Sequence, residues 1–256
     1  MSLLDRVNEL LEHEETFCLV TVVHPDRADS IPLGCKLIVL PDGSVAGEGE
    51  RIQVPSELPA LALRALSERK RSLVELENGV RAFIDLLSGE PKLLICGAGH
   101  IAMPLASFAR QVGFTVTVLD DRPDFANPSR FPGCTVITED FTDALRDMPL
   151  GSSTYVVVIT RGHENDTECL LELLRKETAY VGLIGSRRRI EFVMEILVHE
   201  GIRRDRLEEI FTPIGLPVGA ESPAEIALCI AAELVCVRNA GVEMARSLRT
   251  AAGGAK

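Results

Sequence analysis

The pattern of apolar and polar positions changes near residue 90. Beyond that point short, continuous apolar runs alternate with stretches of helical spacing; the runs read KLLIC, TVTVLD, CTVIT, YVVVIT and YVGLIG. Helices are expected after the first run, from about Asp166, after YVGLIG, and over a long segment at the end. Continuous apolar strands separated by helices are typical of a parallel sheet covered on both faces. The pattern predicts a doubly wound α/β domain over residues 90–240.

Residues 1–89 follow a different pattern. The segment SLLDRVNELL has helical spacing with Ser2 as an N-cap, and a second helix is expected from about Leu58 to Arg71. Strand-like runs are FCLVTVV, CKLIVL, LVELE and VRAFIDLL, and the second of them leads into a tight turn at PDG. These elements predict a smaller α+β domain. Residues 241–256, which end in TAAGGAK, are expected to form a disordered tail.

Composition excludes several classes of protein. The 256 residues carry 27 Lys and Arg against 38 Asp and Glu, a net charge of −11 without a compensating basic stretch. This balance argues against nucleic acid or an anionic membrane as a partner. Apolar runs are too short to span a bilayer and the start lacks signal-peptide features, so a cytoplasmic protein is expected. The 7 cysteines form no C-x-x-C pair, which favours buried reduced thiols over a disulfide framework.

A glycine turn follows the first strand of the second domain. Gly97-Ala98-Gly99-His100-Ile101-Ala102 has the G-x-G-x-x-A form of the Rossmann turn, between a strand and its helix. Gly97 would allow the tight turn, Gly99 a close approach of a ligand, and the helix N-terminus would offer N–H groups to a phosphate. His100 is either an anion donor or an ordinary exposed residue. A turn that binds no ligand is the alternative.

Acidic residues follow the next strand. Asp120 lies at its end, where a dinucleotide-binding domain places the carboxylate that holds the ribose, so NAD is a candidate ligand. Such an acid would disfavour a 2′-phosphate. Asp121 and Arg122 come directly after it and join the candidate binding set.

A polar loop follows the fourth strand. It contains Arg161, Gly162, His163 and Asp166, and because ligands bind beyond the carboxyl ends of strands in open α/β sheets, it should face the same crevice as the glycine turn. Helix capping by Asp166 or Thr167 is the alternative interpretation.

A third loop follows the fifth strand. Gly185 and Ser186 open a helix that begins with the arginines Arg187 to Arg189. A helix start of this kind can hold a phosphate or a carboxylate. One arginine, with Arg187 as the candidate, is expected to contact a ligand, and the others to form a solvated helix face.

Five linked motifs carry a resemblance to a known family. They are GAGHIAMPLA, VTVLDDRPDFANPSRFP, VVVITRGHENDTECL, GLIGSRRR and PIGLPVGAESPAEIALCIAAEL. In this order they resemble the C-terminal Rossmann domain of the XdhC/CoxI family, the xanthine dehydrogenase accessory factors. Upstream, LVTVVHPDRADSIPLGCKLIV and DGSVAGEG are similar to the N-terminal domain of that family.

The resemblance implies binding of the molybdenum cofactor, a phosphate-bearing pterin with a dithiolene-held molybdenum. It further implies protection of this cofactor during sulfuration by a cysteine desulfurase, transfer to a molybdenum hydroxylase apoenzyme, and a homodimer. The chain departs from the family after AGEGE, where no Cys follows. If that segment helps to hold molybdenum in the family, this chain would have to use Cys35 or no thiolate at all. Core packing is the alternative role for Cys35.

Two other functions are compatible with the residues. Gly97, Gly99 and Asp120 alone would suit an NAD-dependent oxidoreductase, with His163 as the catalytic acid or base. A nucleotide-sensing module without turnover is also compatible, because a fold does not fix an activity.

Overall fold

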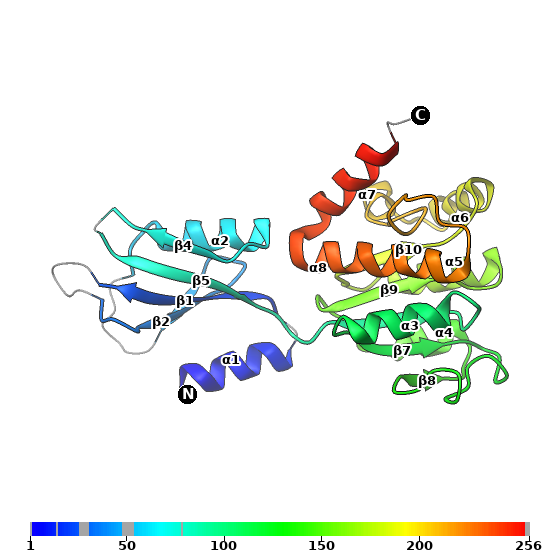
Figure 1. Cartoon of the computed structure of the whole chain (residues 1–256), viewed down its shortest axis with the longest axis horizontal. Coiled ribbons are helices and arrows are strands. Elements are labelled where there is room, and N and C mark those ends of the chain that lie inside the picture. Colours follow the sequence, from blue (N-terminus) through cyan, green and yellow to red (C-terminus); the bar gives the residue numbers. More distant parts are fainter. Residues whose placement is uncertain (1, 14, 26–30, 48–53, 78, 254–256) are drawn as a thin grey trace. The chain divides into compact units, whose positions relative to one another are not determined.

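The computed structural model describes residues 2–13, 15–25, 31–47, 54–77 and 79–253. The chain divides into two compact units (Figure 1). Unit 1 comprises Met1–Gly89 with Asn239–Gly241, and unit 2 comprises Glu90–Arg238 with Val242–Lys256. No helix in the described ranges is both long and apolar enough to cross a membrane.

Unit 1 is an antiparallel sheet with one helix on each face. Its strand order is β3-β2-β1-β5-β4. The strands are β1 (Phe17–His24), β2 (Lys36–Val39), β3 (Val45–Gly47), β4 (Ser72–Glu75) and β5 (Arg81–Leu87), and the helices are α1 (Leu3–Glu12) and α2 (Leu58–Glu68). Ser2 caps α1 in a reciprocal capping box with Asp5, which explains where the helix begins. Alternate strand residues face α2, while Phe17 and Ile38 pack with α1.

Unit 2 is built on a parallel sheet with strand order β10-β9-β6-β7-β8. These strands are β6 (Lys92–Cys96), β7 (Thr115–Leu119), β8 (Thr135–Ile137), β9 (Thr154–Val158) and β10 (Tyr180–Leu183). All five described strands run parallel, and Phe211 adds a parallel bridge beside Gly182 of β10. In chain order within the sheet this is 3-2-1-4-5, the Rossmann topology, so the predicted fold class is confirmed.

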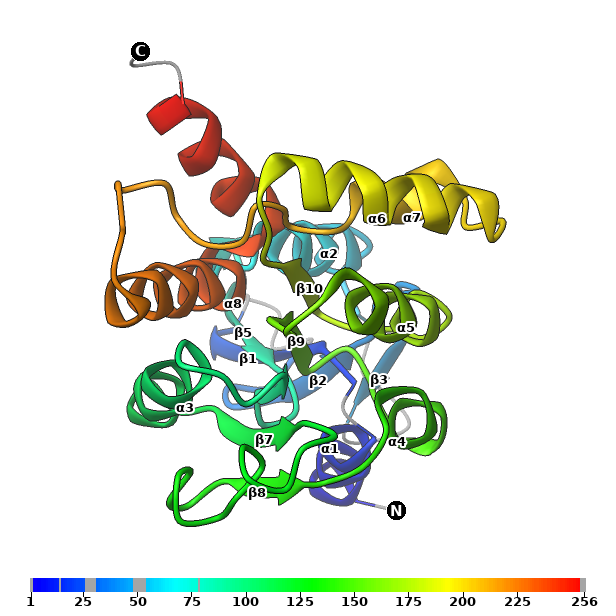
Figure 2. The ribbon, with the colours of Figure 1, turned by 90° about the vertical axis from the view of Figure 1, so that its right-hand side faces the viewer.

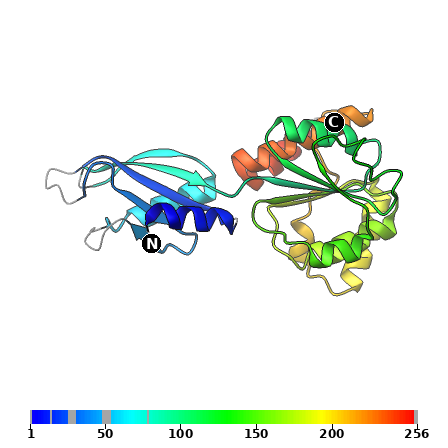
Figure 3. The same ribbon diagram turned by 90° about the horizontal axis from the view of Figure 1, so that it is seen from below.

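Helices cover both faces of this sheet (Figures 2 and 3). On one face lie α3 (Ala102–Gln111) and α8 (Pro223–Gly253), and on the other α4 (Phe141–Asp147), α5 (His163–Leu173) and α6 (Arg187–His199); α7 (Arg204–Glu208) is a short connector. Because both faces are covered, β9 is buried along its whole length. Buried strand side chains alternate between the two helical layers, as the strand period requires.

The structure corrects three expectations for this unit. The segment that connects CTVIT to YVVVIT contains helix α4, whereas the sequence pattern predicts no helix there. Helix α5 begins at His163 rather than near Asp166. The segment after residue 241, predicted as a disordered tail, stays helical to Gly253 after a break at Gly241, which has φ 85°. Buried Ala245 packs this second part onto the core, so its apolar contacts hold it in place.

Candidate functional site

The glycine turn leaves β6 in a conformation that requires glycine at its first position. Gly97 has φ 113°, and a Cβ there would lie 2.5 Å from the carbonyl oxygen of Ile159. Its N–H donates to the carbonyl of Leu119 at 2.7 Å. The turn is therefore packed between the ends of β7 and β9, and the tight-turn role predicted for Gly97 has a direct steric cause.

The next part of the turn is open. A Cβ on Gly99 would have no atom of residues 2–13, 15–25, 31–47, 54–77 or 79–253 within 4 Å. Among the described residues, nothing accepts a hydrogen bond from the N–H groups of Gly99, His100 and Ile101, and α3 has no side-chain N-cap. Free N–H groups at a helix start bind anions readily, since the helix dipole adds to their attraction. The turn thus offers an anion cradle whose N–H groups have no acceptor in the part of the chain that the structure describes.

Asp120 faces the turn rather than a ligand. Its side chain is 1% exposed. One oxygen accepts from the N–H of Ala98 at 2.7 Å, and the guanidinium of Arg122 donates to both oxygens at 2.8 Å. A ribose-binding carboxylate needs a free oxygen at the crevice. This arrangement differs from the predicted contact with a ribose, because Asp120 and Arg122 instead hold the glycine turn in place.

The pKa of Asp120 gives a test of this brace. Burial raises that pKa, but hydrogen bonds from Arg122 and from the N–H of Ala98 outweigh it and hold the value below the ordinary 3.8. A lowered carboxyl pKa adds stability that is present above the unfolded-state value and lost as pH falls through the folded-state value. We expect Asp120→Asn to flatten the fall in unfolding free energy below about pH 4, measured by urea denaturation from pH 2 to 7. An unchanged acid slope would contradict the brace.

The loop after β9 is organised around a buried carboxylate. Asp166 is fully buried, and its oxygens accept from Thr160 Oγ1 at 2.6 Å and Arg189 Nε at 2.7 Å. Arg189 also donates to the Thr160 carbonyl at 3.2 Å. Burial raises the pKa of Asp166, and the Thr160 and Arg189 hydrogen bonds only partly oppose this. Asp166 is thus neither an N-cap nor exposed to a ligand, because it ties the loop after β9 to α6.

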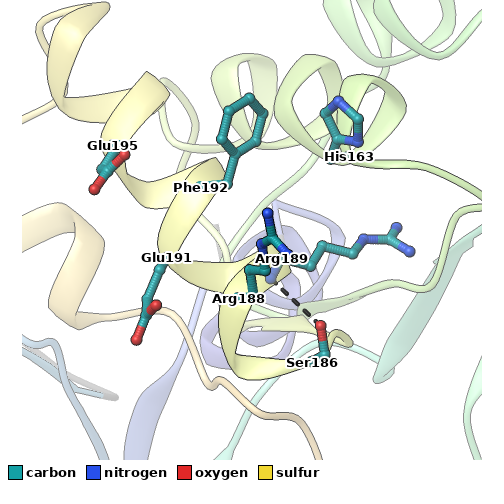
Figure 4. Close-up of a pocket in the computed structure, with 7 residues that line it drawn as sticks. All are labelled: His163, Ser186, Arg188, Arg189, Glu191, Phe192 and Glu195. Carbon is teal, nitrogen blue, oxygen red and sulfur yellow. Dashed lines mark hydrogen bonds between the residues drawn. The ribbon is translucent and has the colours of Figure 1, made fainter.

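A cavity of about 500 Å³ joins the loops that follow β9 and β10 (Figure 4). His163 stands at the first position of α5, and its ring meets that of Phe192 edge to face at 5.0 Å. Ser186 caps α6, and the remaining lining residues are Arg188, Arg189, Glu191 and Glu195. Figure 4 shows the two glutamates on the side of α6 away from His163. With Phe192 47% exposed, the cavity offers an aromatic surface beside positive charge.

The loops after β7 and β9 are also joined. Arg161 Nη2 donates to Asp121 Oδ2 at 2.7 Å. The structure therefore brings the glycine turn, the Asp120–Arg122 segment and the Arg161–Asp166 loop together at one sheet edge, with Gly185 and Ser186 beside the last of these. Arg187 is exposed and does not line the cavity, whereas Arg188 and Arg189 do. Cys35 lies in unit 1 against the core beneath α2.

Sequence reasoning missed several residues of this region. The sequence pattern does not single out Thr160. It predicts that one of Arg187 to Arg189 contacts a ligand, but it does not indicate that Arg189 pairs with a buried carboxylate. A second buried network links Tyr180, which donates to Glu233 at 2.5 Å, with Gly215 and Arg249. No local signal marks Glu233, since it sits among apolar residues of α8. The departure after AGEGE falls on residues 48–53, outside the described residues.

Comparison with known proteins decides the family. A model of the XdhC Rossmann domain matches residues 93–234, more than half of the chain. The chain belongs to the XdhC family. The resemblance to the XdhC Rossmann domain is thereby confirmed for residues 93–234. The matched region begins in β6 and ends in α8, so it contains the glycine turn and all the loops of the site.

Two curated relatives are similar to this chain. Protein YqeB of Escherichia coli (strain K12), described as uncharacterized, is 28% identical, with 93% of this chain and 47% of that protein covered. A probable xanthine dehydrogenase subunit of Bacillus subtilis (strain 168) is 29% identical, with 65% of this chain and 48% of that protein covered. The chain spans about half the length of these curated relatives.

A solved structure is similar over most of the length of this chain. The crystal structure of a xanthine dehydrogenase from Bacillus halodurans has a TM-score of 0.60 and 27% identity, covering 91% of this chain and 63% of that one. Within the described residues, no group of three or more His, Cys, Asp or Glu side chains is arranged to hold a metal ion.

Proposed function

We propose that this chain is an accessory protein that binds the molybdenum cofactor, supports its sulfuration and delivers it to a molybdenum hydroxylase of the xanthine or carbon monoxide dehydrogenase type. Membership of the XdhC family supports this role, as do relatives named for xanthine dehydrogenase. The structural observation that carries the proposal is the open cradle, where the N–H groups of Gly99, His100 and Ile101 have no acceptor among the described residues.

The residues fit the anionic part of the cofactor. Its phosphate would accept from the cradle N–H groups, with exposed His100 and Arg161 as further donors. The ring system would lie along His163 and Phe192, whose rings line the neighbouring cavity. When bound, the cofactor would supply a molybdenum centre whose oxo ligand can be exchanged for sulfido. The chain's own side chains would bind, orient and shield it.

The same proposal includes partners. A cysteine desulfurase would supply the sulfur, the apoenzyme would receive the cofactor, and the chain would act as a homodimer in the cytoplasm. This role needs no turnover by the chain alone. An NAD-dependent oxidoreductase is less well supported, because Asp120 has both oxygens engaged inside the protein instead of free for a ribose.

The small molecule that the protein carries tests the proposal. The chain is expressed in cells that make the molybdenum cofactor and in a matched strain that cannot, then purified and denatured. Mass spectrometry of the released molecules should find a phosphorylated pterin only in the first preparation. Release of NAD instead would favour the oxidoreductase, for which His163→Ala should abolish hydride transfer. Release of neither molecule from the cofactor-producing cells would contradict the proposed function.

A further inference from the structure

One ion pair crosses the sheet edge above the glycine turn. Asp121 follows β7 and Arg161 follows β9, and these strands lie on either side of β6. Strands β7 and β9 are therefore about 10 Å apart, which is two strand spacings. The 2.7 Å contact between Arg161 Nη2 and Asp121 Oδ2 must therefore pass over the end of β6, where Gly97 begins the turn. Arg161, a cation at the same end of the sheet as the glycine turn, is thus held by an internal carboxylate.

This carboxylate is incompletely satisfied. Asp121 Oδ1 is buried yet accepts no hydrogen bond from the described residues, and the nearest other cation is Arg122 Nε at 3.9 Å. Arg122 is already committed to both oxygens of Asp120. Asp121 is thus held by one ion pair whose side chains are 30% and 49% exposed. Partly exposed pairs of this kind contribute little to stability, so this one can open.

A phosphate group is a stronger partner for Arg161 than a carboxylate is. It carries more charge than a carboxylate. Both groups can accept two parallel guanidinium N–H bonds, but a phosphate has further oxygens that the N–H groups of Gly99 to Ile101 can hold. A singly charged anion gains less from these donors. We propose that Asp121 is a built-in competitor for Arg161, which multiply charged phosphate groups displace and weaker anions do not, so that Asp121 determines the selectivity of the cradle.

This inference rests on the proposed function for its ligand, but its test does not need the pterin. In the wild type an anion must take Arg161 from Asp121 before it can bind this side chain, so the ion pair lowers the affinity for every anion. Removing the charge of Asp121 should therefore tighten anion binding and admit weaker anions. The effect should disappear when Arg161 is also removed, because Asp121 would then have nothing to compete for.

Inorganic pyrophosphate is the probe, titrated calorimetrically at low ionic strength so that screening is small. Asp121→Asn should bind it about threefold more tightly than the wild type, the size expected when a partly exposed ion pair no longer has to open. Arg161→Ala should bind it at least about tenfold more weakly. Asp124→Asn is the matched control, since Asp124 is exposed, lies three residues away and loses the same charge. It should stay close to the wild type.

The double variant Asp121→Asn, Arg161→Ala completes the cycle and should match Arg161→Ala alone. The inference is overturned if Asp121→Asn binds pyrophosphate no more tightly than Asp124→Asn, if its gain persists without Arg161, or if no variant binds pyrophosphate. Acetate titrations extend the test, and measurable binding is expected only for Asp121→Asn. Pterin retention is measured separately, so a chain that keeps its pterin but fails this cycle loses only the competitor role.

Discussion

Gly97→Ala is expected to destabilise unit 2 by about 3–5 kcal/mol, the sum of an unfavourable positive φ and a backbone clash. Gly97 has φ 113°, and the new Cβ would lie 2.5 Å from the Ile159 oxygen and 2.8 Å from its carbonyl carbon. That carbonyl belongs to the chain leaving β9, so it cannot move without disturbing the strand. The measurement is the free energy of unfolding from urea denaturation.

Gly113→Ala is the matched control for this substitution. Gly113 also lies in unit 2 and has φ 89°, but a Cβ there would meet only Arg238 Nη1, at 3.9 Å. It therefore carries the cost of the positive φ without the clash, about 1 kcal/mol. Equal losses for the two variants would show that the close approach of the turn to β9 contributes nothing.

Gly99→Val is expected to have the opposite profile, with an intact fold and lost ligand binding. The added Cβ meets no atom of the described residues within 4 Å, and Gly99 has no positive φ, so stability should stay within about 1 kcal/mol of the wild type. The side chain would fill the space that an anion needs to reach the free N–H groups. Pterin retained per purified chain should fall at least about tenfold, with Gly99→Ala intermediate.

Comparison of the Gly97 and Gly99 variants separates the contribution of the turn to stability from its contribution to ligand binding. Thermal unfolding of Gly99→Val checks that its binding loss is not a folding defect. A Gly99→Val chain that folds normally and retains as much pterin as the wild type would place the phosphate elsewhere.

The fold could be predicted because its signals are local. Continuous apolar runs mark strands buried on both faces, and a strand, glycine turn and helix in succession mark the centre of the sheet. The start of α5 was misplaced because Asp166 is a residue type that favours N-caps. Its partner Arg189 lies 23 residues further on, and only the folded sheet brings the two together.

The site was predictable as a set of loops but not as a set of contacts. Strand order places the candidate loops at one edge, which the sequence pattern already indicates. Which partner each carboxylate takes depends on tertiary placement: Asp121 pairs with Arg161, 40 residues away, and Glu233 accepts from Tyr180, 53 residues away. For the same reason Asp120 was assigned to a ribose, although its oxygens brace the turn.

The open turn of this XdhC-family chain is proposed to hold a phosphate-bearing pterin, and everything inferred about its function depends on that binding. The most direct measurement is an anaerobic equilibrium titration of the ligand-free protein with the isolated molybdenum cofactor, followed by the change in pterin fluorescence. We expect saturable binding of one pterin per chain, competed by pyrophosphate and lost in Gly99→Val. A titration of the folded wild-type chain that cannot be distinguished from buffer would contradict the proposed binding.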